Sequence, residues 1–275
     1  MQIVHRFTEP EAFLARAESF LRAAEVENAL MLGICGSAQF DDSCYLATVE
    51  EDRAVVACAL RTPPRSALLT RADRQALELL ATDLADKYRD LPAVAGPEPA
   101  VGVFAGLWSV RTGAAAGLAV RMRVFEARRV VQPPAAAGRF RAATEADLPT
   151  VARWTGEFIE EAGLGDPSAP DDVARERIRE GSLFIWVDAR PVSMAAWAGR
   201  TGRLVRVNYV YTPPEHRRRG YASACVASLT QQLLDEGFAL CCLYTDLANP
   251  TSNKIYQAIG YRPVCDAAEY HLGVG

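Results

Sequence analysis

The sequence predicts an α/β protein in which a mixed β-sheet is flanked by helices. The chain has 275 residues, of which 50% are hydrophobic and 23% charged, a composition typical of a soluble globular protein with a well-filled core. Runs rich in β-branched and aromatic residues alternate with amphipathic runs of helical periodicity. Glycine and proline separate these runs, which indicates regular elements joined by short loops.

The length is that of one large domain or two small ones. Periodicity is lost over residues 131–137, which include Pro133 and Pro134, and consecutive prolines favour an extended linker. We therefore expect an N-terminal domain over residues 1–130, a linker over 131–137 and a second domain over 138–275.

The second domain is predicted to begin with a strand at residues 139–143. Thr144 and Asp147 then have the spacing of a capping box, which opens a helix. The apolar face of that helix contains Leu148, Val151, Ala152 and Phe158. The predicted elements that follow are a helix at 171–179, strands at 183–187, 192–198 and 203–212, a helix at 221–236, a strand at 240–244 and a helix at 250–258. With a final strand, the order is β-α-α-β-β-β-α-β-α-β.

A basic glycine loop, Arg217-Arg218-Arg219-Gly220-Tyr221-Ala222, joins the strand at 203–212 to the helix at 221–236. Backbone N–H groups are unpaired at a helix N-terminus and the helix dipole is positive there. Glycine lets an anion approach the backbone closely, and an arginine supplies a planar set of donors. A run of arginines alone would be a solvated loop. The glycine and the helix together favour a diphosphate site.

A second motif follows the strand at 240–244. Asn249 suits the N-cap of a short helix, Pro250 suits its first position, and Gly260 suits the exit from it. Tyr256 lies on this helix, where spacing alone favours a core residue over a catalytic one.

Together these motifs resemble the GNAT superfamily of N-acetyltransferases. Arg217-x-x-Gly220-x-Ala222 is similar to the acyl-CoA pyrophosphate loop of the family, whose signature is Q/R-x-x-G-x-G/A. The second motif has the family's spacing of an asparagine, a small residue three positions later, a tyrosine four beyond that, and a final Gly-Tyr pair. The resemblance covers residues 138–275 and implies a largely antiparallel central sheet. The C-terminal region is also similar to a glycine-acyltransferase-like branch.

The resemblance implies acetyl-CoA as co-substrate and assigns a role to each matching position. The backbone N–H groups of Val210 and Tyr211 would polarise the thioester carbonyl, and Tyr256 would protonate the departing thiolate. The other implied cofactor-binding residues are Thr212, Arg217, Arg218, Arg219, Gly220, Tyr221 and Ala222, with Asn249 and Asn253 on the pantetheine arm. A buried strand for Val210 and Tyr211, and a helix cap for Asn249, are the alternative interpretations.

The general base is not identified by the sequence. Family members often have a glutamate on the strand before the loop, but this chain has Asn208 there, and an amide cannot accept the proton. The candidates are Asp246, Glu157, Glu160, Glu161 or an ordered water, and for each carboxylate a solvated surface position is the other interpretation.

The first half of the chain is predicted to be a diverged copy of the second. Arg6-Phe7 followed by Thr8-Glu9 mirrors Arg139-Phe140 followed by Thr144-Glu145. An amphipathic helix follows these residues, and then strands at 44–49, 54–60 and 66–70 precede a helix at 71–88. Residues 70–74, which open that helix, include no glycine, so side chains should block a phosphate. We expect this half to bind no CoA and to serve in packing or acceptor recognition.

Composition excludes several other classes. The 7 cysteines form no C-x-x-C pair and the 3 histidines lie far apart, so we expect no disulfide framework and no metal site. A net charge of −4 argues against nucleic acid as a partner. We find neither an apolar run of transmembrane length nor a signal-peptide pattern, so we expect a cytoplasmic protein without a membrane partner. No pattern indicates the oligomeric state.

The expected function is an acetyl-CoA-dependent N-acyltransferase, in which an amine attacks the thioester directly in a ternary complex. The acceptor is a small molecule, an amino acid or a peptide or protein amine. An acidic group of Glu157, Glu160, Glu161 and Asp166 is compatible with a cationic acceptor. Two alternatives remain: a non-catalytic acyl-CoA-binding sensor or scaffold, and a nucleic-acid binder that uses residues 217–219.

Overall fold

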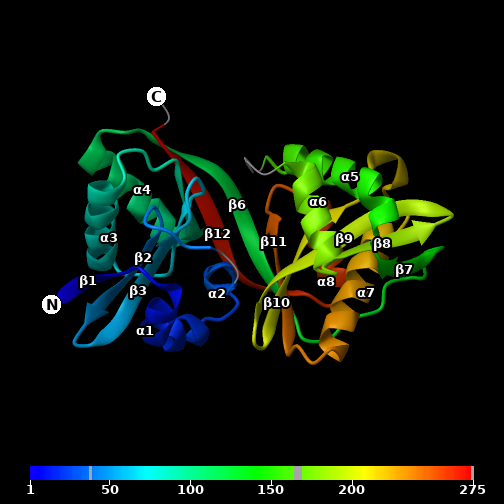
Figure 1. Cartoon of the computed structure of the whole chain (residues 1–275), viewed down its shortest axis with the longest axis horizontal. Helices are drawn as coiled ribbons and strands as arrows, with labels where there is room; N and C mark the ends of the chain where they lie inside the picture. Colours follow the sequence, from blue (N-terminus) through cyan, green and yellow to red (C-terminus); the bar gives the residue numbers. More distant parts are fainter. Residues whose placement is uncertain (37–38, 164–168, 274–275) are drawn as a thin grey trace. The chain divides into compact units, whose positions relative to one another are not determined.

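The computed structural model describes residues 1–36, 39–163 and 169–273 of the chain (Figure 1). The chain forms two compact units. Unit 1 comprises Met1–Val124, Tyr244–Asn249 and Pro263–Gly275, and unit 2 comprises Phe125–Leu243 and Pro250–Arg262. No helix in the described ranges has both the length and the apolar character needed to cross a membrane.

Unit 1 is a sheet with helices on both faces. Its strand order is β1-β2-β3-β4-β5-β12-β6, and the pairs from β1 to β12 are antiparallel except for the parallel pair β4 and β5. One core lies against α3 and α4, and the other against α1 and α2. The elements are β1 (Gln2–Phe7), α1 (Pro10–Ala23), α2 (Ala29–Cys35), β2 (Tyr45–Glu51), β3 (Ala54–Arg61), β4 (Ala67–Leu69), α3 (Arg74–Lys87), β5 (Ala93–Pro97), α4 (Glu98–Thr112), β6 (Ala116–Ala127) and β12 (Arg262–Leu272).

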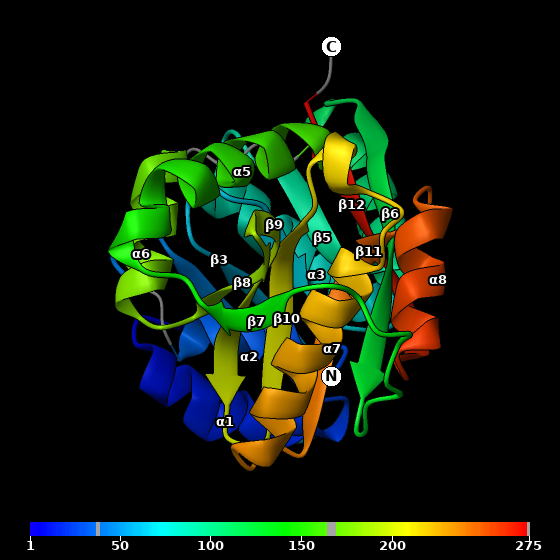
Figure 2. The ribbon, with the colours of Figure 1, turned by 90° about the vertical axis from the view of Figure 1, so that its right-hand side faces the viewer.

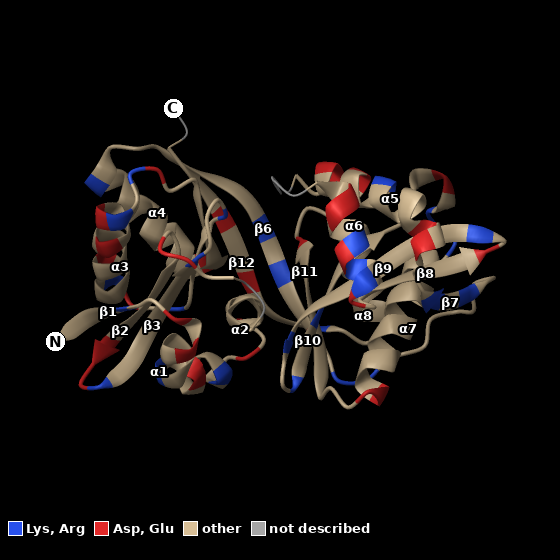
Figure 3. Ribbon diagram, in the orientation of Figure 1, with Lys and Arg blue, Asp and Glu red and all other residues tan. Residues whose placement is uncertain are grey.

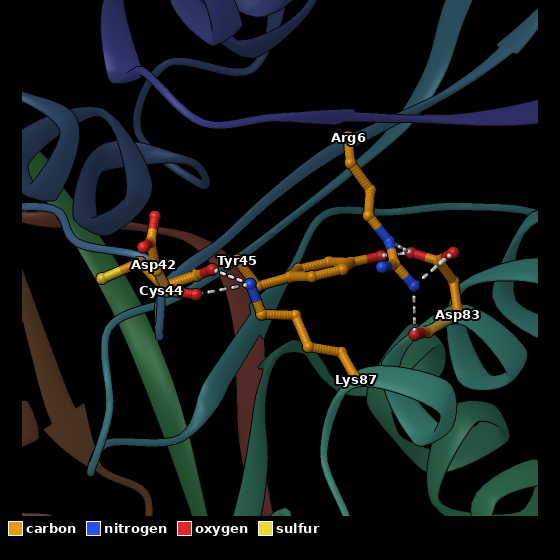
Figure 4. A network of polar contacts seen from close by, with 6 residues as sticks. All are labelled: Arg6, Asp42, Cys44, Tyr45, Asp83 and Lys87. Carbon is orange, nitrogen blue, oxygen red and sulfur yellow. Dashed lines mark hydrogen bonds and ion pairs between the residues drawn. The ribbon is translucent and has the colours of Figure 1, made fainter.

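A polar network ties β1, β2 and α3 of unit 1 together (Figure 4). Arg6 Nε donates to Asp83 Oδ2 at 2.7 Å, and the Tyr45 hydroxyl donates to the same oxygen at 2.5 Å. Lys87 Nζ donates to the carbonyl oxygens of Cys44 and Asp42 at 2.5 and 3.1 Å. Arg6 and Asp83 form an ion pair and the Lys87 ammonium is bonded to two carbonyl oxygens, so this network stabilises the unit.

Unit 2 has the same layered arrangement (Figure 2). Its strand order is β11-β10-β9-β8-β7, antiparallel except for β10 and β11. One core lies against α7 and α8, and the other against α5 and α6. The elements are β7 (Arg139–Ala142), α5 (Leu148–Glu161), α6 (Pro170–Arg179), β8 (Leu183–Asp188), β9 (Arg190–Thr201), β10 (Leu204–Tyr211), α7 (Tyr221–Asp235), β11 (Leu240–Asp246) and α8 (Pro250–Ala258).

The predicted capping box at the start of unit 2's helices is present. The Thr144 side chain accepts from the backbone of Asp147, and the Asp147 side chain accepts from the backbone N–H of Thr144 at 2.8 Å. Arg141 Nη1 also donates to Asp147 at 2.7 Å. These contacts lower the pKa of Asp147 to about 2, with Arg141 as the first cause. A short 3-10 helix, Glu145–Asp147, precedes α5, so the turn is tighter than the continuous helix predicted.

The two halves of the chain repeat one order of elements, β-α-α-β-β-β-α-β-α-β, from β1 to β6 and from β7 to β12. The last strand of each half contributes to the other unit. Strand β12 pairs with β5, with Ala268 opposite Gly96, and Phe125 and Ala127 at the end of β6 lie in the core of unit 2. The units therefore interleave along the chain, and residues 131–137, the predicted linker, lie within unit 2. Hydrophobic periodicity identifies a strand but not the sheet that it joins.

Candidate functional site

Strand β10 separates from its neighbour β11 in the middle of unit 2. The parallel pairing extends from Leu204 opposite Leu240 to Arg206 opposite Cys242. Beyond it, the register of β10 with β9 shifts between Asn208 and Tyr211, and Tyr209 has a φ of 48°. A non-glycine residue in this conformation marks a β-bulge, which turns the strand and redirects its backbone groups. Val210 and Tyr211, the residues predicted to polarise a carbonyl, lie in this irregular segment.

The predicted anion site is the start of α7. Gly220 is the N-cap, with φ 80° and ψ −1°, and no side chain caps the helix. A Cβ at this position would meet only Ala136 Cβ, at 3.8 Å, so the space beside the backbone is open. Arg218 also has a positive φ, of 62°. The N–H groups of the first turn are thus not used by a cap, and they lie beside exposed arginines.

The three arginines before Gly220 differ in their contacts. Arg217 Nε donates to the carbonyl oxygen of Thr212 at 2.8 Å, and its Nη2 donates to Glu161 Oε2 at 2.6 Å. Its guanidinium also lies 5.8 Å from the centre of the Tyr211 ring. Arg218 and Arg219 are exposed. Arg217 therefore fixes the loop to the end of β10, while Arg219 interacts with the Tyr221 hydroxyl and Arg218 is exposed beside it.

Two residues that sequence reasoning missed, Ser193 and Asp188, support the loop. Ser193 on β9 contacts the Thr212 hydroxyl at 2.8 Å and donates to the Tyr211 carbonyl oxygen at 3.1 Å. Tyr221 is buried, and its hydroxyl donates to Asp188 Oδ2 at 2.6 Å. Glu161, expected only as a base candidate and as part of an acidic group, holds Arg217. The partners in these contacts are distant in sequence, and we find no sequence pattern that identifies them. Ala222, the small residue of the signature, is half-buried in the first turn of α7.

Tyr256 lies in the core of unit 2. Its side chain is 7% exposed and its ring centre lies 6.4 Å from that of Phe125 and 6.0 Å from that of Tyr261. Burial raises the pKa of Tyr256, so the hydroxyl stays protonated. This environment agrees with the interpretation of Tyr256 as a core residue. It also keeps on the hydroxyl the proton that a general acid needs. The catalytic role of Tyr256 stays a prediction.

Helix α8 occupies the predicted range, Pro250–Ala258. Asn253 is half-buried on it, and Asn249 is exposed immediately before it. Asn249 belongs to unit 1, where its N–H donates to the Asp246 carbonyl oxygen at 3.1 Å. The proposed contacts of both asparagines with a pantetheine arm stay predictions.

Among the predicted base candidates, Glu157 has the most relevant position. It is half-buried on α5, and the pKa of Tyr211 is raised to about 12 by burial and by a hydrogen bond with Glu157. Arg153 donates to Glu157 at 2.7 Å. Glu160 is exposed. Asp246, in unit 1, accepts from the N–H of Ala248 at 2.7 Å.

The predicted acidic group does not form a free anionic surface. Glu157 is paired with Arg153 and Glu161 with Arg217, at 2.7 and 2.6 Å. Asp166 lies outside the described residues. Because two of the carboxylates already have cationic partners, they attract a cationic acceptor less strongly than free carboxylates would.

The corresponding helix of unit 1, α3, has a different start. Asp73 is its N-cap, and Oδ1 accepts from the Ala76 N–H at 2.8 Å. Gln2 Nε2 donates to Asp73 Oδ2 at 2.8 Å. These bonds lower the pKa of Asp73, with the Ala76 N–H as the first cause. A carboxylate thus occupies the position that a phosphate would need, which supports the prediction that this half binds no CoA.

Within the described ranges, no group of three or more histidine, cysteine, aspartate or glutamate side chains has the arrangement of a metal site.

Residues 186–270 match a family model described as FR47-like protein. Many solved structures resemble the whole chain, and three of them are described here. A GCN5-related N-acetyltransferase from Kribbella flavida is 19% identical, with a TM-score of 0.61, over 92% of this chain and 96% of that one. A GCN5-related N-acetyltransferase from Sphaerobacter thermophilus is 16% identical, with a TM-score of 0.63, over 98% and 95%. A tandem GNAT protein from the clavulanic acid biosynthesis pathway is 12% identical, with a TM-score of 0.59, over 99% and 98%.

The fold is that of the GNAT superfamily, arranged as two tandem units. The predicted fold class and the predicted resemblance to this superfamily are confirmed. The glycine-acyltransferase-like branch and the degeneracy of the first half stay predictions.

Proposed function

We propose that this protein is an acetyl-CoA-dependent N-acyltransferase that acetylates a primary amine by direct attack in a ternary complex. The observation that carries the proposal is the start of α7, where Gly220 leaves the helix without a side-chain cap beside two exposed arginines. Such a helix N-terminus matches the charge and size of a diphosphate. The contrast with α3, which is capped by Asp73, supports a single CoA site in unit 2.

The chain's own groups account for the remaining steps. The N–H groups of Val210 and Tyr211, in the bulge of β10, would donate to the thioester carbonyl oxygen and stabilise the negative charge that develops on it. The acceptor nitrogen forms a bond to the acetyl carbon while the carbon–sulfur bond breaks. The nitrogen loses one proton and the sulfur gains one, so the charges balance.

Glu157 is the proposed acceptor of the amine proton, acting on it through the Tyr211 hydroxyl or through water. This assignment rests on the position of Glu157 beside Tyr211 at the end of β10. Tyr256 is the proposed donor to the thiolate, because burial keeps its hydroxyl protonated at neutral pH.

The first test is thermal unfolding with and without acetyl-CoA. A ligand that binds only the folded protein adds about 2.7 kcal/mol at 100 times its Kd, so a clear rise in Tm is expected. Thiol release from acetyl-CoA is then measured with a panel of amines. A Tm that does not change at saturating acetyl-CoA would overturn the proposal. Retention on DNA that depends strongly on salt, without protection by acetyl-CoA, would support the nucleic-acid alternative.

A non-catalytic acyl-CoA sensor is the second candidate, and the deep burial of Tyr256 favours it. The variant Tyr256→Phe separates the two functions because it removes only the hydroxyl. For an enzyme, acetyl-CoA binding should persist while kcat falls about 100-fold or more, the usual contribution of a general acid. If turnover is unchanged, Tyr256 is not the acid. If the wild type releases no thiol with any amine but binds acetyl-CoA, the sensor is the better assignment.

A further inference from the structure

Among the polar side chains of unit 2 that have buried atoms without hydrogen-bond partners, three come from β10 and from α6, two elements of the same half of the fold. They are Arg206 and Asn208 on β10 and Arg177 on α6, and the atoms are Arg206 Nη1, Asn208 Oδ1 and Arg177 Nε. Residues two apart on a strand share one face of the sheet, and Val205 and Val207 of β10 lie in the core against α7. Arg206 and Asn208 are therefore on the opposite face, which α5 and α6 cover.

Arg177 is held in place by its surroundings. Its Nη1 donates to the Trp197 carbonyl oxygen at 3.1 Å, and its guanidinium lies 4.4 Å from the centre of the Tyr209 ring. The pKa of Arg177 is lowered, first by burial, and the charge of Arg206 acts in the same direction. Arg177 therefore lies over the stretch of β10 that contains Tyr209, next to Asn208 in sequence.

Among the described residues, no acidic side chain forms an ion pair with Arg177 or Arg206. Two acidic residues of α6 and its C-terminal end are close to Arg177 in sequence. Glu176 pairs with Arg179, and Glu180 acts on Arg177 only at longer range. Figure 3 shows the mixture of acidic and basic residues along α6. Half-buried cations without a counter-charge are costly, and a bound anion would remove that cost.

We infer that Arg206 and Arg177 bind a carboxylate group of the acceptor, while Asn208 Oδ1 accepts a hydrogen bond from its amine. The guanidinium fork matches a carboxylate, to which it donates two parallel hydrogen bonds. The atoms on β10 without hydrogen-bond partners are complementary to such a molecule, because Arg206 offers hydrogen-bond donors and Asn208 offers a hydrogen-bond acceptor. This inference rests on the proposed function and specifies its acceptor.

The position of the three residues relative to the bulge sets the size of this acceptor. Arg206 and Asn208 are about 7 Å apart along β10 at about 3.3 Å per residue. Asn208 comes directly before Tyr209 and the irregular segment whose N–H groups would hold the thioester carbonyl. An amine at Asn208 would be next to that carbonyl, with its carboxylate only a few bonds away at Arg206. The acceptor class is therefore a small amine that also has a carboxylate.

The test compares amines that differ only in this group. Alanine, phenylalanine and lysine are each assayed as the free acid and as the amide, by thiol release from acetyl-CoA. At least one acid should be acetylated with a KM about 10-fold or more below that of its amide. In Arg206→Gln the KM for that acid should rise about 10- to 100-fold, the loss expected for one charged hydrogen-bonded contact. The KM for the amide and for acetyl-CoA should stay unchanged.

Matched variants separate this effect from damage to the fold. Arg175→Gln, two residues before Arg177 on α6, removes an exposed arginine with a 58% exposed side chain and should change no KM. Arg206→Lys keeps the charge and should restore part of the affinity for the acid. The Tm of each variant without ligand shows whether it folds.

Two results would overturn the inference while the proposed function stands. One is that acids and amides have equal KM values, or that neither is acetylated, although acetyl-CoA raises the Tm. The other is that Arg206→Gln, still folded, raises the KM for acid and amide alike. If acetyl-CoA itself fails to raise the Tm, the proposed function fails as well, and the acceptor inference fails with it.

Discussion

Replacing Gly220 with alanine is the most direct perturbation of the proposed diphosphate site. Gly220 has φ 80° and ψ −1°, and a left-handed conformation costs about 1–2 kcal/mol for a residue with a Cβ. The added methyl would be in ordinary contact with Ala136 at 3.8 Å, so no clash adds to that cost. We expect the Tm without ligand to fall by about 2–8 °C.

The effect on acetyl-CoA binding should be separate from this loss. A Cβ at the N-cap projects into the open space beside the first-turn N–H groups and would keep a phosphate away from them. Losing one hydrogen bond to a charged group costs about 1.5–3 kcal/mol, which corresponds to a rise in Kd of about 10- to 100-fold. Isothermal titration calorimetry with acetyl-CoA measures this value directly.

Unit 1 offers a matched control. Gly113 follows α4 with φ 76° and ψ −4°, and a Cβ there would meet nothing within 4 Å. Gly113→Ala therefore imposes nearly the same backbone strain far from the α7 loop in sequence. It should lower the Tm by a similar amount and leave the Kd for acetyl-CoA unchanged. If Gly220→Ala binds acetyl-CoA as tightly as the wild type, or if both variants weaken binding equally, the proposed diphosphate site at Gly220 is wrong.

Three further predictions follow from the contacts around the site. Glu161→Gln should free Arg217 for the diphosphate and lower the Kd for acetyl-CoA by up to about fivefold, because an exposed ion pair contributes about 0–1 kcal/mol; a higher Kd in calorimetry would contradict this. Glu157→Gln should lower kcat at pH 7 by about 100-fold in the thiol-release assay if Glu157 takes the amine proton. The control variant Glu160→Gln, at an exposed neighbouring position, should keep the kcat of the wild type. Equal kcat values for the two variants would mean that water, not Glu157, is the base. Asp147→Asn should lose about 2 kcal/mol of stability at pH 7, because the folded pKa is lowered from 3.8 to about 2. That contribution is present above about pH 4 and is lost as the pH falls towards 2, so urea unfolding curves of wild type and variant should converge in acid; a constant difference would refute the linkage.

Local sequence signals were sufficient for most of unit 2. The capping box at Thr144, the strand-to-helix junction at Gly220 and the helix from Pro250 to Ala258 are all present where they were predicted. Each depends on interactions within a few residues, such as a cap, a positive φ or an apolar periodicity. Such signals are recorded in the sequence itself.

In unit 1 the prediction was less complete. The strands expected at 44–49 and 54–60 and the helix expected at 71–88 correspond to β2, β3 and α3, but α2, β5, α4 and β6 were not expected. Strand β5 is five residues long, and α4 is apolar on most of its surface, with buried Ala100, Val101, Phe104, Ala105 and Trp108. Short and uniformly apolar segments lack the period that distinguishes a helix from a strand.

The sequence by itself determined the order of elements in the second half of the chain and the glycine loop of a GNAT fold, because these depend on contacts between near neighbours along the chain. Tertiary structure alone decided that β12 joins the sheet of unit 1, that Glu161 holds Arg217 and that Arg177 lies over the Tyr209 ring. Each of these pairs brings together residues separated by tens to more than a hundred positions. Such contacts form only when the sheets and helices pack, so no local pattern specifies them.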